Sequence, residues 1–208
     1  HYKQDRMFEL ALRFRMPIVL FGEGGGGRPG DDSTGPAVAF DTHTFTQFSK
    51  LSGAVPMIGV NHGRCFAGNT ALLACCDVII ATKDSTIAMG GPAMIEGGGL
   101  GIYTPEEVGP MSFQVPNGVV DILVEDEAEA VRVAKQYLSY FQGSIDTWEA
   151  PDQRKLRHIV PENRLRLYDM REIISTVADR DSVLEIRAGF GVGVITCFIR
   201  VEGRPMGV

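Results

Sequence analysis

Two glycine-rich turns contain the residues of this 208-residue chain that are best placed to do chemistry. The first turn reads FGEGGGGRPG over residues 21–30 and follows the apolar run 17–20. Glycine loses more conformational freedom on folding than any other residue, so four in succession indicate a backbone that approaches a ligand or takes positive φ. The second turn covers residues 63–69 and follows the apolar run 55–60. Peptide N–H groups of two such neighbouring turns can point at one oxygen atom and stabilise negative charge on it, as in an oxyanion hole.

Other uses of these glycines have to be weighed against this one. The pattern G-x-G-x-x-G at residues 22–27 formally matches a dinucleotide-binding fingerprint, but Pro29 follows where a helix should begin at once. A phosphate-binding loop of the Walker type is excluded because no Gly-Lys-Ser/Thr sequence occurs. For Gly63 and Gly68, close packing of a strand on a helix is an alternative that requires no ligand.

Composition narrows the class of protein. With 44% hydrophobic and 22% charged residues, the chain is typical of globular proteins that bury a sizeable core. A net charge of −6 provides no basic surface for nucleic acid, and no apolar run reaches the roughly 18 residues of a membrane span. The four cysteines lack the spacing of a disulfide framework or a metal site. We therefore expect reduced thiols, no metal and a cytoplasmic location, with the mitochondrial matrix as an alternative.

Helices and strands alternate along the sequence. Helical periodicity predicts helices over residues 5–15, 38–51, 69–76, 126–141 and 170–178. Thr104 is suited to cap a further helix with Pro105 as its first residue. Apolar runs predict strands over residues 17–21, 55–60, 77–81, 119–124 and 192–201. Strands that are apolar throughout, rather than alternating, are typical of a parallel sheet covered on both faces, so the sequence predicts an α/β fold.

The composition changes near Trp148. Residues 152–171 are dense in Arg, Asp and Asn and contain few apolar runs, so we expect a surface connection between two domains. We assign residues 1–150 to a first domain, and residues 151–208 to the connection and the beginning of a second domain. The chain opens directly on the helical pattern 5–15, and we expect the upstream part of the first domain and the rest of the second to be missing.

Residues 60–89, VNHGRCFAGNTALLACCDVIIATKDSTIAM, resemble the signature of the enoyl-CoA hydratase (crotonase) superfamily, in which a Gly-x-x-x-Gly-Gly-Gly turn precedes an apolar helix. The hydratases have a water-activating glutamate where this chain has Ala71, so we expect no hydration chemistry. Further segments resemble one branch of the superfamily, the carboxyltransferases of biotin-dependent acyl-CoA carboxylases: residues 21–30, 90–109, 117–127, 160–186 and 190–208. The resemblance covers essentially the whole chain. It implies a crotonase-like (ββα-superhelix) domain with parallel sheets flanked by helices, followed by the start of a second similar domain.

The resemblance also implies a reaction and a site. A carboxyl group moves from carboxybiotin to the α-carbon of an acyl-CoA thioester through an enolate, and the biotin nitrogen takes the proton, so no protein base is needed. The amides of Gly25 and Gly26 are implied to form the oxyanion hole. The implied substrate-binding residues are Gly27, Arg28, Gly63 and Gly68. Residues 109–114 depart from the family, which often has a histidine there.

The implied cofactor is biotin, carried on another domain or subunit, and the implied substrate is a coenzyme A thioester. The implied partners are biotin carboxylase and biotin carboxyl carrier domains or subunits, in a homo-oligomer or a multi-subunit complex, with neither nucleic acid nor membrane. We expect a biotin-dependent acyl-CoA carboxyltransferase that is inactive as this stretch alone. Two alternatives stay open: an acyl-CoA decarboxylase on the same fold, and a non-catalytic assembly subunit in which the glycines only serve packing.

Histidines and arginines outside the turns have simpler explanations. His43 and His62 stand alone near the ends of strands and helices, and we expect them to be structural. His158 lies in the basic connection and is expected to be exposed. Four arginines of that connection could attract CoA phosphates, but a salt-bridge surface between domains needs no ligand: Arg154, Arg157, Arg164 and Arg166.

Overall fold

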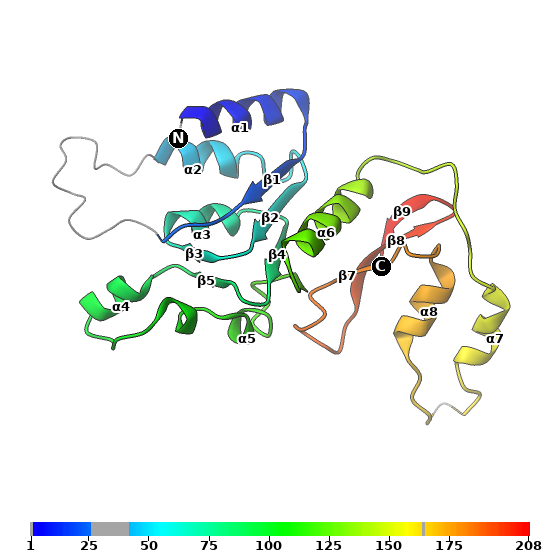
Figure 1. Ribbon diagram of the computed structural model, residues 1–208. Helices are drawn as coiled ribbons and strands as arrows, with labels where there is room; N and C mark the ends of the chain where they lie inside the picture. The colour runs from blue at the N-terminus through cyan, green and yellow to red at the C-terminus, as the bar shows by residue number, and fades with distance from the viewer. Residues whose placement is uncertain (1, 26–41, 164) are drawn as a thin grey trace. The chain divides into compact units, whose positions relative to one another are not determined.

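The computed structural model describes residues 2–25, 42–163 and 165–208. These residues divide into two compact units, unit 1 (His1–Ala134) and unit 2 (Lys135–Val208) (Figure 1). The two units meet within one helix, α6 (Glu127–Ser139). The domain boundary expected at residue 150 stays a prediction. Residues 38–41, part of an expected helix, lie outside the described ranges.

A parallel sheet of four strands forms the centre of unit 1. The strands lie in the order β1-β2-β4-β6, and all three neighbouring pairs are parallel. Their bounds are β1 Ile18–Phe21, β2 Met57–Asn61, β4 Val78–Thr82 and β6 Ile122–Val124. Every residue of β2 and β4 is buried, so both faces of the sheet are covered at these two strands, and this explains their unbroken apolar sequence. The α/β fold expected from the sequence is confirmed.

Successive strands leave this sheet and continue in a second, smaller one. β2 passes into β3 (Arg64–Phe66) and β4 passes into β5 (Thr86–Ala88), and β3 and β5 pair in parallel. The segment after β1 joins the same layer, because Gly24 forms a parallel bridge with Cys65. The sequence predicted a turn where β3 lies and gave no sign of β5, since strands of three residues are too short to show a period.

Three helices of unit 1 pack against one face of the first sheet: α1 (Tyr2–Phe14), α2 (Thr42–Ser49) and α3 (Gly68–Leu73) (Figure 1). The rings of Phe8 and Phe48 lie 4.7 Å apart between α1 and α2. Fully burying side chains of this size stabilises the fold by about 1.5–3 kcal/mol each. The buried apolar residues of the cluster are Phe8, Ala11, Phe48, Leu51, Val55, Met57 and Leu72.

The segment after β5 contains a helix that the sequence did not predict. α4 (Pro92–Gly97) lies in a sequence rich in glycine and begins with its proline as the first helical residue. Thr104 stands at the start of a helical turn as expected and forms a capping box with Glu107, but this turn is only the 3-10 helix η3 (Pro105–Glu107). α5 (Met111–Gln114) then places Met111 in the core between the two sheets.

Unit 2 is built on an antiparallel sheet of three strands in the order β7-β8-β9. Their bounds are β7 Leu184–Ile186, β8 Thr196–Val201 and β9 Arg204–Gly207. The helices of the unit, besides the end of α6, are η4 (Gln153–Lys155), α7 (Leu156–Ile159) and α8 (Met170–Val177). On α8, Ile174 packs against Cys197 and Ile199 of β8. No helix in the described ranges is long and apolar enough to cross a bilayer.

A buried arginine joins three segments of unit 2. Arg200 on β8 is only 5% exposed. Its guanidinium donates to three carbonyl oxygens, those of Gly203 at 2.7 Å, Gly143 at 3.0 Å and Ser139 at 2.6 Å. Ser139 is the last residue of α6, where the helix dipole concentrates negative charge. The guanidinium also lies over the ring of Tyr140, with its carbon 5.4 Å from the ring centroid. Arg200 therefore holds α6, the turn after it and the β8–β9 turn together.

Candidate active site

The glycine turn after β1 crosses from the first sheet of unit 1 to the second. The Gly22 N–H still donates to β2, at 2.8 Å. The Gly24 N–H then donates to the Arg64 carbonyl at 2.8 Å, and the Gly24 carbonyl accepts from the Phe66 N–H at 2.9 Å. Gly24 has a φ of +142°, and a Cβ at this residue would lie 2.2 Å from Nδ2 of Asn69. Only glycine fits here, so the crossing explains part of the glycine run.

Gly25, the next residue, is exposed. Within the part of the chain that the structure describes, its N–H has no hydrogen-bond partner, and no heavy atom lies within 4 Å of the position that a Cβ would take. The Gly25 carbonyl oxygen lies 3.7 Å from the position that a Cβ would take at Gly91, a residue on the turn after β5. Gly26, Gly27 and Arg28 lie outside the described residues, so their expected roles stay predictions.

The second turn lies beside the first because it follows β3, the strand with which Gly24 pairs. Ala67 has φ +55° and ψ −124°, a positive-φ backbone that directs the chain from β3 into α3. The Ala67 N–H donates to the carbonyl oxygens of Ala88 and Met89 at 3.3 and 3.1 Å. Gly68 is the first residue of α3, and its N–H has no partner among residues 2–25, 42–163 and 165–208, as is usual for the first turn of a helix.

The sequence did not point to Ala67, although a signal for it was present. Counted from Gly63, Ala67 stands where the Gly-x-x-x-Gly-Gly-Gly signature has the first of its three consecutive glycines. The positive φ explains why glycine suits this position, and an alanine adopts it at a cost of about 1–3 kcal/mol. The bent backbone is therefore a feature of the turn itself and is kept despite the Cβ.

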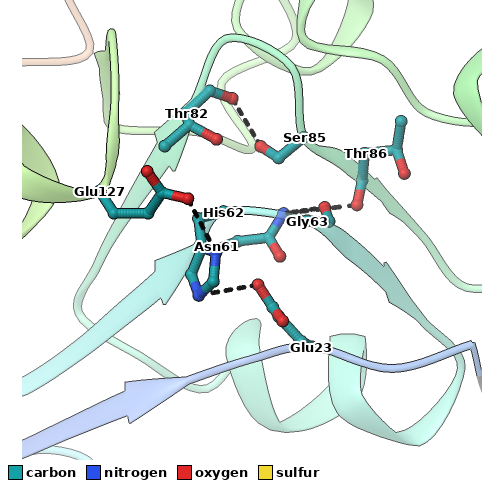
Figure 2. A network of polar contacts seen from close by, with 8 residues as sticks. All are labelled: Glu23, Asn61, His62, Gly63, Thr82, Ser85, Thr86 and Glu127. Atoms are coloured by element: carbon teal, nitrogen blue, oxygen red, sulfur yellow. Dashed lines mark hydrogen bonds and ion pairs between the residues drawn. The ribbon is translucent and has the colours of Figure 1, made fainter.

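Gly63 lies at the other end of β3 from Ala67 and Gly68. Its carbonyl oxygen accepts from the Thr86 N–H at 3.0 Å and from Nδ2 of Asn61 at 3.2 Å (Figure 2). The structure thus brings the Gly68 turn to the first glycine turn and places Gly63 in the bend between β2 and β3. The expected contact of Gly63 with substrate stays a prediction.

His62 lies in the same bend, and two carboxylates from other segments face its ring (Figure 2). His62 Nε2 lies 2.9 Å from a Glu23 carboxylate oxygen, and His62 Nδ1 lies 3.5 Å from a Glu127 carboxylate oxygen. Next to His62 in the sequence, Asn61 also donates from Nδ2 to the Thr86 carbonyl at 3.4 Å. Polar side chains therefore connect the bends where the strands pass from one sheet to the other.

The thiols of unit 1 are poor nucleophiles at neutral pH. Burial raises the pKa of Cys65, which lies on β3 next to the turn. Burial, together with the neighbouring Cys75 and Asp77, raises the pKa of Cys76 to about 12. In the described ranges no group of three His, Cys, Asp or Glu side chains is arranged to hold a metal ion. The groups that the two turns offer to a negatively charged oxygen are backbone N–H dipoles.

Parallel strands that bend from one sheet into a second, each followed by a turn and a helix, define a crotonase-like domain. A family model described as the carboxyl transferase domain matches residues 2–208, and the chain belongs to this family. The fold and the family that the sequence suggested are therefore confirmed.

Known proteins of this family resemble the chain over nearly its whole length. The chain is 58% identical to a single-chain, multi-domain long-chain acyl-CoA carboxylase, with a TM-score of 0.94. This match covers 100% of the present chain and 20% of the carboxylase. The chain is 28% identical to transcarboxylase 12S, a hexamer assembly solved with methylmalonyl-coenzyme A, with a TM-score of 0.79. This match covers 98% of the present chain and 41% of the transcarboxylase chain. The chain is 27% identical to the methylmalonyl-CoA decarboxylase subunit alpha of Veillonella parvula, and this match covers 96% of the present chain and 41% of that subunit. The chain thus spans about two fifths or less of the length of these relatives.

Proposed function

We propose that the protein containing this chain transfers a carboxyl group from carboxybiotin to the α-carbon of an acyl-CoA. The observation that carries the proposal is the Gly25 N–H, which has no partner within the described residues and lies beside the Ala67–Gly68 turn in a chain of the carboxyl transferase family. An acyl thioester suits such a group because its carbonyl oxygen becomes negative when the α-carbon loses its proton. Interactions that are stronger with that transition state than with the substrate are the ones that accelerate the reaction.

In this proposal the amides of Gly25 and Gly26 donate to the thioester oxygen and stabilise the enolate. Each well-placed donor of this kind is worth about 2.7–4 kcal/mol in comparable sites. Gly24 is fixed by its bridge to Cys65, so the backbone that leads into Gly25 is held before substrate arrives. Carboxybiotin supplies the carboxyl group, and its ring nitrogen accepts the α-proton. Gly27, Arg28, Gly63 and Gly68 are proposed to contact the coenzyme A thioester.

We further propose a long-chain acyl-CoA as the substrate. The neighbour with 58% identity is described as a long-chain acyl-CoA carboxylase. The segment that follows β5 begins beside the site, where Gly91 approaches the Gly25 carbonyl, and it exposes apolar side chains that suit contact with a fatty acyl chain. These side chains are Met89, Met94, Leu100, Ile102 and Tyr103.

The proposed partners are a biotin carboxylase and a biotin carboxyl carrier, either fused to this chain or present as separate subunits. The hexamer assembly of transcarboxylase 12S supports an oligomer. Because the chain spans only part of its relatives, we expect these 208 residues alone to have little or no transferase activity. A cytoplasmic location stays a prediction.

The test is a carboxylation assay of the full-length, assembled and biotinylated protein with labelled bicarbonate, ATP and a series of short- and long-chain acyl-CoAs. We expect acid-stable label in the acyl-CoA product, most of it with long chains, and none after avidin blocks the biotin. No incorporation by an assembled, biotinylated complex with any acyl-CoA would contradict the proposal. Robust product formation by the isolated 208-residue stretch would contradict the need for further domains.

A decarboxylase is the second candidate, because the chain is 27% identical to a methylmalonyl-CoA decarboxylase subunit. Loss of a carboxyl group from a carboxyacyl-CoA passes through the same enolate, so the same amides would serve it. A decarboxylase releases labelled carbon dioxide from a carboxyacyl-CoA and does not fix labelled bicarbonate in the presence of ATP. The same preparation therefore separates the two candidates.

A further inference from the structure

His62 occupies the bend between β2 and β3, and carboxylates from two other segments face its two ring nitrogens (Figure 2). Glu23 belongs to the glycine turn after β1, and its oxygen lies 2.9 Å from Nε2. Glu127 is the first residue of α6, and its oxygen lies 3.5 Å from Nδ1. The imidazole is 34% exposed, so it is partly shielded by the segments that it joins.

The two contacts use different nitrogens of the ring. Nε2 approaches Glu23 at hydrogen-bond distance, whereas Nδ1 lies farther from Glu127, which is more exposed than Glu23. His62 therefore connects the turn after β1 to the start of α6 through opposite edges of one ring.

The connection reaches the candidate active site through Glu23. Glu23 immediately precedes Gly24 and is two residues from Gly25. Its carboxylate also lies close over Gly63, where a Cβ would be 3.0 Å from the Glu23 Oε1 atom. Because Gly63 has no side chain, the carboxylate can approach His62 at this point. Glu23 lies between Gly22, whose N–H donates to the Val60 carbonyl, and Gly24, whose N–H donates to the Arg64 carbonyl, where the chain crosses from β1 to β3.

We propose that His62 is a positioning residue for the turn that presents the Gly25 amide, acting through Glu23 and anchored by Glu127. Its effect on catalysis rests on the proposed function, whereas its effect on the turn does not. His62 does not touch substrate in this role. His62 sets the direction of the Gly25 N–H, and the stabilisation that this N–H gives to the enolate depends on its alignment with the thioester oxygen.

The test compares His62→Gln with His158→Gln in the full-length enzyme. His158 is exposed on α7 of unit 2 and provides a matched loss of an imidazole. We expect His62→Gln to lower kcat by about 10- to 100-fold and to change KM for acyl-CoA by less than about twofold, because a small misplacement of a donor acts on the transition state. We expect Glu127→Gln to act in the same direction, and His158→Gln to leave both constants unchanged.

Hydrogen exchange followed by mass spectrometry provides a readout that does not depend on activity. We expect the hydrogen-bonded amides of Gly22 and Gly24 to exchange about tenfold faster in His62→Gln, while amides of α1 keep their wild-type rates. Unchanged exchange of these two amides, or an unchanged kcat, would overturn the inference. Faster exchange throughout unit 1 with a lower melting temperature would overturn it as well, since a general loss of stability would then explain the rate. If the wild-type protein fails to carboxylate, the proposed function fails and the exchange rates alone decide the role of His62.

Discussion

The hydroxyl of Thr86 on β5 is buried and, in the described part of the chain, has no hydrogen-bond partner. The hydroxyl of Thr70 on α3 is buried too, but it donates to the carbonyl oxygens of Cys65 at 2.7 Å and Ala88 at 3.0 Å. We expect Thr86→Val to raise the free energy of unfolding by about 1 kcal/mol, because it removes an unpaired polar group. We expect Thr70→Val to lower it by about 1–3 kcal/mol, because it removes the hydrogen bonds that the hydroxyl donates to these two carbonyls. Melting temperatures of the two full-length variants measure the signs, and equal destabilisation would contradict this explanation.

The thiol of Cys76 predicts a loss of stability at alkaline pH. Burial raises its pKa from 9.0 to about 12 in the folded chain. Below pH 9 the thiol is protonated in both states, so its contribution to stability is complete there. As the pH rises from about 9 towards 12, the unfolded chain releases this proton first, and the free energy of unfolding falls. The melting temperature of Cys76→Ala should therefore fall less than that of the wild type between about pH 8.5 and about pH 10.5. Equal falls would show that this thiol makes no such contribution.

At the scale of residues, the sequence indicated the glycines but not the groups around them. The run of four glycines made Gly24 and Gly25 visible, because few other roles explain such a run. Alanine is not a residue type that favours positive φ, so the residue type at position 67 did not predict the positive φ of Ala67. The contacts of His62 with Glu23 and Glu127 depend on three segments that meet only in the folded chain, and no local pattern encodes them.

At the scale of elements, the buried arginine of unit 2 offers a test of how α6 is held. Arg200→Met removes the donors to three carbonyl oxygens, including that of Ser139 at the end of α6. We expect this change to lower the free energy of unfolding by about 2–3 kcal/mol, since buried carbonyls are left unpaired. Arg204→Met, on the exposed part of β9, is the matched control and should change it by less than about 0.5 kcal/mol. Limited proteolysis of the full-length variants near residue 143 measures the difference, and equal cleavage would argue against the role of Arg200.

The long helices could be predicted, whereas β3, β5 and α4 could not. Residues 5–15 and 126–141 show helical periodicity over several turns, and α1 and α6 formed there. β3 and β5 have three residues each, and their pairing with one another is set by the bends that lead into them. α4 forms within a glycine-rich sequence, because its proline supplies a first residue with a suitable φ.

At the scale of the whole molecule, unbroken apolar strands separated by helices predicted the fold class, since strands of this kind are typical of a parallel sheet buried on both faces. The domain boundary expected at residue 150 stays a prediction. Composition changes near Trp148, where the connection becomes exposed, whereas the two compact units meet within α6. A helix that continues from one unit into the other keeps a single periodicity and gives no sign of that boundary.

The central proposal is that the Gly25 amide stabilises negative charge on a thioester oxygen, and Gly25→Val tests it most directly. No atom of the described residues lies within 4 Å of the added Cβ, so folding and assembly should survive the change. Gly193→Val in unit 2 has equally open surroundings in the described structure and is the matched control.

The measurement is kcat for carboxylation of acyl-CoA by the assembled full-length variants with labelled bicarbonate. We predict that Gly25→Val lowers kcat by about 10²- to 10³-fold while the oligomer remains intact, and that Gly193→Val turns over at the wild-type rate. Loss of assembly with unchanged turnover per assembled particle would favour the non-catalytic scaffold. An assembled Gly25→Val enzyme that carboxylates at the wild-type rate would contradict the oxyanion hole.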